Sequence, residues 1–275
     1  MVSKNLARCL AKICGDGHIS PKYLRYNNTC KELLDEFEED IKKEFGDFHL
    51  IRGKVNSGTS FIQIQRKEIL SVFLSHLNSF KSNDISIPRA VKKSSVDIKI
   101  AFIRAFYDDE GCAALRFNKL TQEWKRNINL SSNSFRILSE IKQILSLLKI
   151  TSNKIHKNNL NNSYDKTHIL SISGRNNFKI FREKIGFKHP RKKLILDLIL
   201  ESYSATPRRK PLEFKKLKEK LDLIPVPIKG KSGQLSGSPT HKCSTPRNVC
   251  VLNSHMSQVQ AQSVFEMGTG VTTQL

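Results

Sequence analysis

Hydrophobic residues recur at helical spacing in two short stretches that both end on an acid followed by a glycine. The first stretch reads LARCLAKICGDG and the second AFIRAFYDDEG. Ala11 and Gly15 share one face of the first helix, and Ala105 precedes Asp109 by the same four positions. Small side chains allow two helices to approach closely. We therefore expect these two motif helices to pack against each other.

The segments after the two motif helices run in the same order, which indicates an internal repeat. In each, alternating strands precede an amphipathic helix, and further strands and a short helix follow. In the two amphipathic helices the matching apolar positions are Leu33, Leu34, Phe37 and Ile41 in the first and Ile137, Leu138, Ile141 and Leu145 in the second. The pattern predicts an α+β fold of two pseudo-symmetric αββαββα repeats with antiparallel sheets, packed through the motif helices.

Composition shifts along the chain predict five regions. Pro88 lies in the stretch that joins the two repeats, and Ser94 with Asp97 is expected to cap the second motif helix. The last stretch is rich in Ser, Thr, Gln and Gly without periodicity, which is typical of disorder. The predicted regions are a first repeat at 1–80, a linker at 81–94, a second repeat at 95–204, a basic C-terminal extension at 205–232 and a disordered tail at 233–275.

The charge balance points to a polyanionic partner. The 275 residues include 47 Lys and Arg against 25 Asp and Glu, a formal net charge of +22, and such an excess favours nucleic acid, although a merely cationic protein remains the alternative. The cysteines show no zinc-ligand spacing. No stretch predicts a membrane span or a secretion signal. We expect a protein that is not secreted, in the cytoplasm of an archaeon or in the matrix or stroma of an organelle.

The acids that end the two motif helices are the candidate metal ligands. Asp16 and Glu110 each precede a glycine that we expect to end the helix in the left-handed conformation. A carboxylate at a helix C-terminus is unfavourable by roughly 0.3 to 1 kcal/mol. A divalent ion shared by both carboxylates and by the main-chain carbonyls of Gly15 and Asp109 would relieve the repulsion.

The paired stretches resemble the two motifs of a single-chain LAGLIDADG homing endonuclease, over roughly residues 3–204. In the register of that family, CLAKICGDG and IRAFYDDEG place the metal-binding acids on Asp16 and Glu110. The chain departs from the family at Lys12, where an apolar residue is usual. It also departs at Asp109, where a small residue is usual and where the acid would loosen the helix packing or add a third carboxylate near the metal ions.

The resemblance implies a fold, an activity and a cofactor. The two sheets would form a DNA-binding saddle in a monomer with internal pseudo-twofold symmetry. The reaction would be hydrolysis of one phosphodiester in each strand of double-stranded DNA across the minor groove, leaving short 3′ overhangs. The cofactor would be Mg²⁺ or Mn²⁺, and the nucleophile would be a water activated by the metal rather than a side chain.

Polar strand faces supply the predicted DNA contacts. Arg, Lys, Asn and Gln recognise base edges in the major groove, where strands fit, although a solvated sheet face is the alternative for any single strand. Two sheets end to end would cover about 15 to 18 base pairs of an asymmetric site. The predicted DNA-contacting residues are Lys22, Arg25, Asn27, Arg52, Lys54, Gln63, Gln65, Arg66, Arg116, Lys125, Asn127, Asn129, Lys154, Lys157, Ser171 and Arg175.

Two further groups complete the expected site. Gln65, Lys67 and Arg175 come where the last strand of each repeat ends, and we expect them to assist catalysis beside Asp16 and Glu110, with phosphate anchoring as the alternative role. An acidic cluster should face away from DNA, because phosphate would repel it. Its members are Glu32, Asp35, Glu36, Glu38, Glu39 and Asp40.

Two other functions fit the same scaffold. One is an intron maturase that binds intron RNA, which the basic extension would suit, and the other is a DNA-binding regulator without catalysis. The presence of both acids, Asp16 and Glu110, favours a site-specific double-strand endonuclease encoded in an intron. An intein is not expected, because no splicing block precedes the first motif and the chain ends in Gln-Leu.

Overall fold

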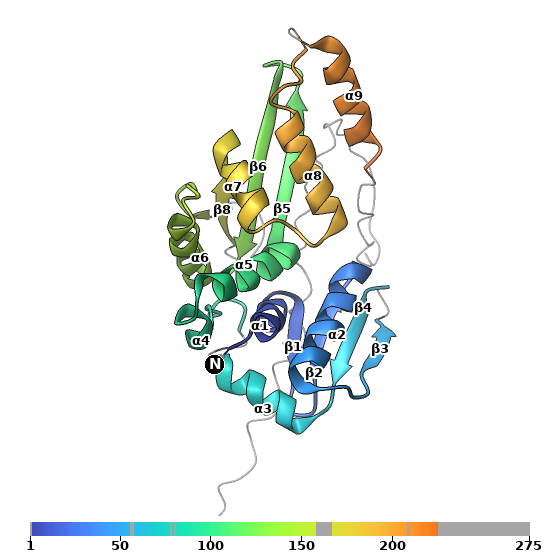
Figure 1. Cartoon of the computed structure of the whole chain (residues 1–275), viewed down its shortest axis with the longest axis vertical. Helices are drawn as coiled ribbons and strands as arrows, with labels where there is room; N and C mark the ends of the chain where they lie inside the picture. Colours follow the sequence, from blue (N-terminus) through green and yellow to red (C-terminus); the bar gives the residue numbers. More distant parts are fainter. Residues whose placement is uncertain are drawn as a thin grey trace, which may run out of the picture.

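The computed structural model describes residues 2–55, 58–77, 79, 81–157, 167–207 and 210–224. Two halves share one order of elements, each beginning with a long helix that leads into a sheet (Figure 1). The first half contains α1 (Lys4–Asp16), β1 (Gly17–Ile19), β2 (Leu24–Asn28), α2 (Lys31–Phe45), β3 (Ile51–Lys54), β4 (Ser60–Ile64) and α3 (Lys67–His76). The second contains α5 (Val96–Glu110), β5 (Gly111–Asn118), β6 (Glu123–Ser132), α6 (Phe135–Leu147), β7 (His156–Lys157), β8 (His168–Ile172) and α7 (Arg175–Lys184).

The predicted fold class is confirmed. Each half has the order αββαββα, and the antiparallel sheets have the strand orders β1-β2-β4-β3 and β5-β6-β8-β7. Three further helices, not part of the repeat, are α4 (Arg89–Lys92), α8 (Pro190–Glu201) and α9 (Pro211–Asp222). No helix among the described residues is both long enough and apolar enough to cross a membrane.

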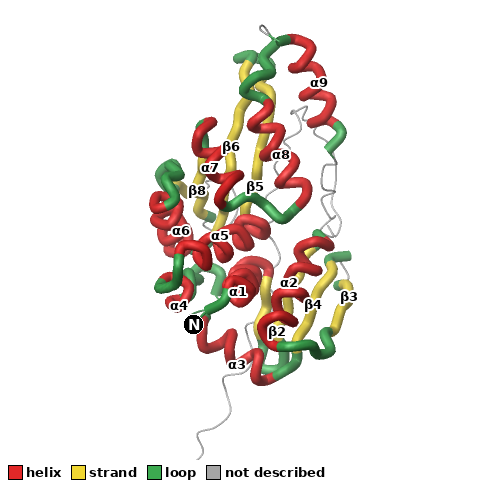
Figure 2. Tube along the Cα trace, viewed as in Figure 1, coloured by secondary structure: helices red, strands yellow, loops and turns green. Residues whose placement is uncertain are grey.

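The motif helices α1 and α5 pack against each other at the centre of the molecule, between the two sheets (Figure 2). Their shared core includes Leu10, Phe102 and Phe106, all fully buried. A Cβ atom built on Gly15 would lie 3.0 Å from the Cβ of Asp109. The larger residue of one helix therefore meets the glycine of the other, so that Asp109 does not loosen the packing.

The glycines after the motif acids do not adopt the left-handed conformation that we expected. Gly17 has φ −88° and Gly111 has φ −88°, both in extended backbone that leads directly into a strand. Their requirement for glycine is steric instead. A Cβ on Gly17 would lie 2.3 Å from the Cα of Ile13, and one on Gly111 would lie 2.4 Å from the carbonyl oxygen of Tyr107.

The start of α5 also differs from the prediction. Ser95 occupies the N-cap position, and it makes no side-chain capping hydrogen bond. Ser94 instead donates from Oγ to the carbonyl oxygen of Ala90, 2.6 Å away. The reason is that α4 ends at Lys92, two residues before this serine, and the last carbonyls of a helix lack amide partners. Asp97 forms an ion pair with Lys4 of α1 at 3.0 Å.

Helices cover one face of each sheet, and no described helix covers the other face. In Figure 1, α2 lies over the first sheet and α8 over β5 of the second, on the same side of the molecule, and α6 packs against β6 and β8. Strand alternation buries Leu24, Tyr26 and Ile62 under the helices of the first half. The uncovered side is called the open face below; its polar members are Arg25, Asn27 and Gln63 in the first sheet and Arg116, Lys125, Asn127, Asn129 and Ser171 in the second.

The expected regions outside the repeats are only partly described. The linker at 81–94 contains α4, and its Ile87 is fully buried. The extension at 205–232 contains α9, whose Leu217 is buried against the body of the second half. The tail at 233–275 lies outside the described residues, so its predicted disorder stays a prediction.

Candidate metal centre and nucleic-acid interface

Asn28 connects the carboxylates of the two halves. This residue ends β2 on the covered face, and its Nδ2 donates to Asp16 Oδ2 at 3.2 Å and to Asp109 Oδ1 at 3.2 Å. The hydroxyl of Tyr26, on the same face of β2, donates to Asp109 Oδ1 at 2.6 Å. One strand of the first half therefore fixes the ends of both motif helices.

Three carboxyl groups at this junction raise one another's pKa. Burial and the charge of Glu110 raise the pKa of Asp16 to about 7. Burial and the charge of Asp109 raise the pKa of Glu110 to about 8. The pKa of Asp109 is raised far above its usual value by burial and then by Asp16. The surroundings thus do not stabilise three ionised carboxylates together, and the cluster remains reachable because Asp16 and Glu110 are only partly buried.

The residues present fit a divalent cation with few protein ligands. Oδ2 of Asp109 is buried without a hydrogen-bond partner, and it faces Gly15 at the helix crossing. Within the described ranges, no cluster of three His, Cys, Asp or Glu side chains has the arrangement of a closed metal site. Mg²⁺ is commonly held by one or two carboxylates and completed by water and phosphate oxygens. Asp16 and Glu110 supply such a partial ligand set.

One of the two main-chain ligands predicted for this ion already has a cationic partner. The carbonyl oxygen of Asp109 accepts a hydrogen bond of 3.2 Å from Nζ of Lys192, which comes from α8. The assignment of Gly15 and Asp109 as carbonyl ligands stays a prediction, and a cation already contacts the second of them.

Lys12, which replaces an apolar residue of the family motif, is fully buried beneath the site. Its ammonium pairs with Glu36 of α2 at 3.3 Å and donates to the carbonyl oxygen of Leu33 at 3.2 Å. It also lies 5.0 Å from the centre of the Tyr26 ring. Arg104 of α5 contacts the same Glu36 at 2.7 Å. The departure from the family pattern is therefore compensated by an ion-pair network that joins the two halves.

The structure does not bring the expected catalytic assistants to the carboxylates. Strand pairing sets Gly17 opposite Tyr26 and Tyr26 opposite Ile62, and Gln65 follows Ile62 by three residues, roughly 10 Å along a strand. Lys67 is farther still, at the start of α3. None of Gln65, Lys67 and Arg175 makes a hydrogen bond or ion pair with the motif acids in the described part of the chain. Their catalytic role stays a prediction.

Arg175 has a different neighbour. Its guanidinium lies 5.6 Å from the ring centre of Tyr203, and Arg126 covers the same ring at 4.2 Å. Arg126 belongs to the covered face of β6, as the alternation of WKRNINLS predicts, and its Nε donates to Ser202 at 2.6 Å. Arg175 is therefore placed beside the helices and away from the junction of the motif helices.

The open face of the first sheet carries an arginine that is held in position. Both Nε and Nη2 of Arg25 donate to Gln63 Oε1, the former at 3.0 Å. The guanidinium also lies 4.3 Å from the ring centre of Phe61. Gly53 makes room for that ring, because a Cβ there would lie 2.5 Å from it. These contacts fix the position of the guanidinium on the open face and leave part of its hydrogen-bonding capacity unused among the described residues.

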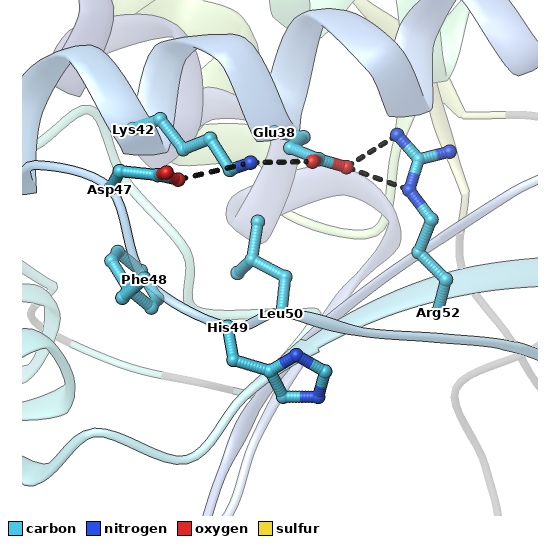
Figure 3. A pocket seen from close by; sticks show the side chains of 7 residues that line it. All are labelled: Glu38, Lys42, Asp47, Phe48, His49, Leu50 and Arg52. Carbon is cyan, nitrogen blue, oxygen red and sulfur yellow. Dashed lines mark hydrogen bonds and ion pairs between the residues drawn. The ribbon is translucent and has the colours of Figure 1, made fainter.

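Arg52 and Lys54, both predicted to contact DNA, lie with the helices instead of on the open face. The register sets Arg52 opposite Ile62, a covered position. Figure 3 shows Glu38 of α2 between Arg52 and Lys42, and Arg52 also pairs with Asp35 at 3.0 Å. The pocket drawn there, about 450 Å³, is enclosed by this acidic helix and the segment before β3. Alternation separates Arg52 and Lys54 from Ile51 and Gly53, but it does not show which of the two faces a helix covers, and here the acids of α2 pair with Arg52 on the covered face.

The acidic cluster lies on α2, as predicted, and much of its charge is paired. Asp40 contacts Arg8 of α1, and Glu39 contacts Lys43 at 2.6 Å. Four other predicted contact residues lie outside the open face. Lys22 lies in the β1–β2 turn, Arg66 at the N-cap of α3, Lys154 before β7, and Lys157 at a covered position of β7 opposite His168.

Three residues of the junction were not anticipated from sequence. Leu24, Tyr26 and Asn28 alternate onto the same, covered face of β2. A polar residue at the end of that otherwise buried face was the available signal for Asn28. Lys192 lies one helical turn before Leu196, which is 1 % exposed, and a lysine in line with a buried leucine was its signal. Neither signal specifies the partner, because the partner lies in another element.

Comparison with known families agrees with this arrangement. A family model described as the LAGLIDADG-like domain matches residues 97–186, which run from the first turn of α5 to the second residue after α7. The chain contains a LAGLIDADG-like domain. The matched region includes Glu110 and the whole second sheet, and the first half repeats its order of elements.

Two curated relatives come from Methanocaldococcus jannaschii. A glutamine–fructose-6-phosphate aminotransferase is 24% identical over 233 residues, which cover 82% of this chain and 20% of the relative. A probable translation initiation factor IF-2 is 25% identical over 196 residues, 64% of this chain and 15% of the relative. The chain thus spans a fifth or less of the length of these curated relatives.

Solved structures with a similar arrangement include two kinds of protein. The homing endonuclease I-DmoI, in a complex with DNA and Mn, is 16% identical with a TM-score of 0.49, over 67% of this chain and 97% of that chain. Full-length WhiA from Thermotoga maritima is 13% identical with a TM-score of 0.45, over 74% of this chain and 62% of that chain.

Proposed function

We propose that the chain is a site-specific DNA endonuclease that hydrolyses phosphodiester bonds with divalent metal ions held by Asp16 and Glu110. The observation that carries the proposal is the junction of the two motif helices. There, partly exposed carboxylates from both halves meet without enough positive charge to offset them. When bound, Mg²⁺ or Mn²⁺ supplies an activated water and positive charge near the phosphoryl oxygens.

The residues around the acids orient them for this task. Asn28 donates to the Asp16 carboxylate and keeps it directed toward the junction. Tyr26 holds the Asp109 side chain between the helices, away from solvent. The nucleophile in this proposal is a water activated by the metal rather than a side chain.

The open faces supply the DNA-binding surface. Arg116 and Lys125 are cross-strand neighbours on the second sheet, and Arg25 lies on the first. Cationic and amide side chains on a face that is free of the α2 acids suit phosphate and major-groove contacts. Because the two faces carry different residues, we expect a long asymmetric target, bound by one copy of the chain.

The test is selection of cleaved sites from a randomised duplex library with Mg²⁺. The proposal predicts that sequencing of the cut ends recovers one long asymmetric site, cut in both strands, and that chelation of the metal abolishes the cuts. A library that yields an enriched bound site but no cut site would instead support a DNA-binding regulator. Splicing of an intron RNA by the protein, without DNA cleavage, would support a maturase.

A further inference from the structure

The C-terminal turn of α5 is closed by a lysine from another helix. Nζ of Lys192 donates to the main-chain carbonyl oxygens of Tyr107 at 3.3 Å, of Asp109 at 3.2 Å and of Asp108. The last carbonyls of a helix have no amide partners of their own, and a positive charge there is favoured by the helix dipole. Lys192 therefore satisfies the end of the helix that carries Glu110.

The helix that carries Lys192 is anchored to the same turn. The main-chain amides of Lys188 and His189, at the start of α8, each donate to Asp108 Oδ1 at 2.9 Å. Asp108 also pairs with Arg104 one turn earlier in α5, at 3.5 Å. The contacts are reciprocal: a side chain of α5 holds the start of α8, and a side chain of α8 holds the end of α5. This reciprocity fixes the position of the ammonium.

The end of α1 is built differently. In the register of the two motifs, Cys14 stands where α5 has Asp108, and Asp16 is held by the neutral amides of Asn27 and Asn28. No lysine or arginine donates to the last carbonyls of α1 in the described ranges. The first half also has no helix equivalent to α8, since α3 is followed by the linker and the four-residue α4. The two halves of the site thus differ in charge and in support.

Glu110 depends on this support more than Asp16 does. Its carboxylate makes no hydrogen bond to a described residue, whereas Asp16 accepts one from Asn28. Burial and Asp109 raise the pKa of Glu110, and Lys192 is the cation that opposes them. The orientation of Glu110 therefore follows from the orientation of the turn that Lys192 closes.

We infer that Lys192 is a positioning residue for Glu110, so that cleavage of one DNA strand depends on Lys192 more than cleavage of the other strand does. The inference rests on the proposed endonuclease function. A duplex has its two strands related by a twofold axis, and the motif helices are related by a pseudo-twofold axis, so each acid lies nearer to one scissile phosphate. Removal of Lys192 slows the cut served by Glu110 more than the cut served by Asp16, on which Lys192 acts only through its charge.

The experiment follows both strands separately. A duplex with the selected site carries a different fluorophore on each strand, and single-turnover cleavage is measured for wild type, Lys192→Met, Lys192→Arg and Lys193→Met. Lys193 is the exposed neighbour and loses the same charge, which makes it the matched control. Hydrogen exchange at the amides that end α5 gives a readout that requires neither metal nor activity.

The inference predicts that Lys192→Met slows one strand at least tenfold, leaves the other within threefold, and speeds hydrogen exchange at the end of α5. Lys192→Arg, which keeps the charge, should restore much of the strand balance, and Lys193→Met should resemble wild type. Equal slowing of both strands, or no slowing, would overturn the inference while leaving the endonuclease intact. A wild-type protein that cuts neither strand would overturn both.

Discussion

Asn28 joins the ends of the two motif helices in one hydrogen-bonded unit. A single amide nitrogen serves both Asp16 and Asp109, so that a shift of one helix end is transmitted to the other. Ionisation of Asp16, Asp109 and Glu110 together is costly for the metal-free protein, because each charge disfavours the ionisation of another. This cost is the physical basis for a dependence of stability on pH and on divalent cations.

Stability of the metal-free protein should fall as pH rises toward 8. The folded-state pKa values of Asp16 and Glu110, about 7 and about 8, lie above the ordinary values of 3.8 and 4.5. The folded state therefore binds protons more tightly than the unfolded state, and this contribution is complete below pH 4 and lost as pH passes through about 7 to 8. Asp16→Asn removes one of the two contributions.

Urea unfolding of wild type and Asp16→Asn at several pH values, in chelator, measures the effect. At pH 8 we expect the variant to have a free energy of unfolding higher by about 1 to 3 kcal/mol, discounted for partial exposure of the side chains. At pH 4 the two proteins should be nearly equal. Mg²⁺ should stabilise wild type more than the variant at pH 8. Parallel curves across this range would show that the carboxyls do not repel each other.

Individual residues were predictable from sequence where one element decides their place. Asp16 and Glu110 were identified because the motif pattern fixes them at helix ends, and Arg25 because strand alternation fixes its face. Lys192 was not, because its partners are carbonyls of a helix more than eighty residues away. The extended conformation of Gly17 was missed because a clash with its own helix, rather than a turn, requires the glycine there.

At the scale of elements, α1, α2 and α5 form one buried assembly with charges inside it. Glu36 of α2 lies between Lys12 of α1 and Arg104 of α5, at 3.3 Å and 2.7 Å. Burial raises the pKa of Glu36, but the two cations outweigh it and the net shift is downward. The carboxylate is thus ionised at neutral pH and serves as a polar link between the halves.

Glu36→Leu should destabilise the protein by about 3 to 5 kcal/mol, because Lys12 is fully buried and would lose its charged partner. The double variant Lys12→Met with Glu36→Leu removes both charges and should recover most of the loss. Urea unfolding of the two single variants and the double variant completes the cycle. Additive losses would mean that the two side chains do not interact in the folded protein.

The elements themselves followed from the sequence because local signals agreed with the fold. The 3.6-residue pattern marked the motif helices, and alternation marked the strands. The helices α4 and α8 were not anticipated as elements of their own. Both helices pack on another element; the start of α8, for example, donates a hydrogen bond to Asp108. Such packing leaves no periodic pattern in the sequence that would separate these helices from the end of a repeat.

At the scale of the whole molecule, charge is divided between two sides. The acidic helix α2 lies over the covered face of the first sheet, and cations and amides occupy the open faces. Arg52 belongs to the acidic side, where Asp35 and Glu38 pair with it. The acidic side formed by α2 and Arg52 therefore contributes little of the net charge of +22 that would attract a polyanion.

Variants on the two sides should separate DNA binding from net charge. Arg116→Ala with Lys125→Ala removes two neighbouring cations of the open face, and we expect weaker DNA binding and a salt dependence lowered by about one unit per lost phosphate contact. Arg52→Ala lowers the net charge on the covered side and should leave both quantities nearly unchanged. Fluorescence anisotropy at several salt concentrations measures the slopes. Equal effects of Arg52→Ala and the open-face variants would contradict this division.

Cleavage of the selected duplex by Asp16→Asn and by Glu110→Gln, with DNA affinity measured in parallel, tests the central claim that the paired acids form a metal-dependent nuclease site. Each variant should make the double-strand break at least about 100-fold more slowly than wild type in Mg²⁺, while its affinity for the same duplex stays within about threefold, under 1 kcal/mol. If either variant cuts at the wild-type rate, the two carboxylates do not form that site.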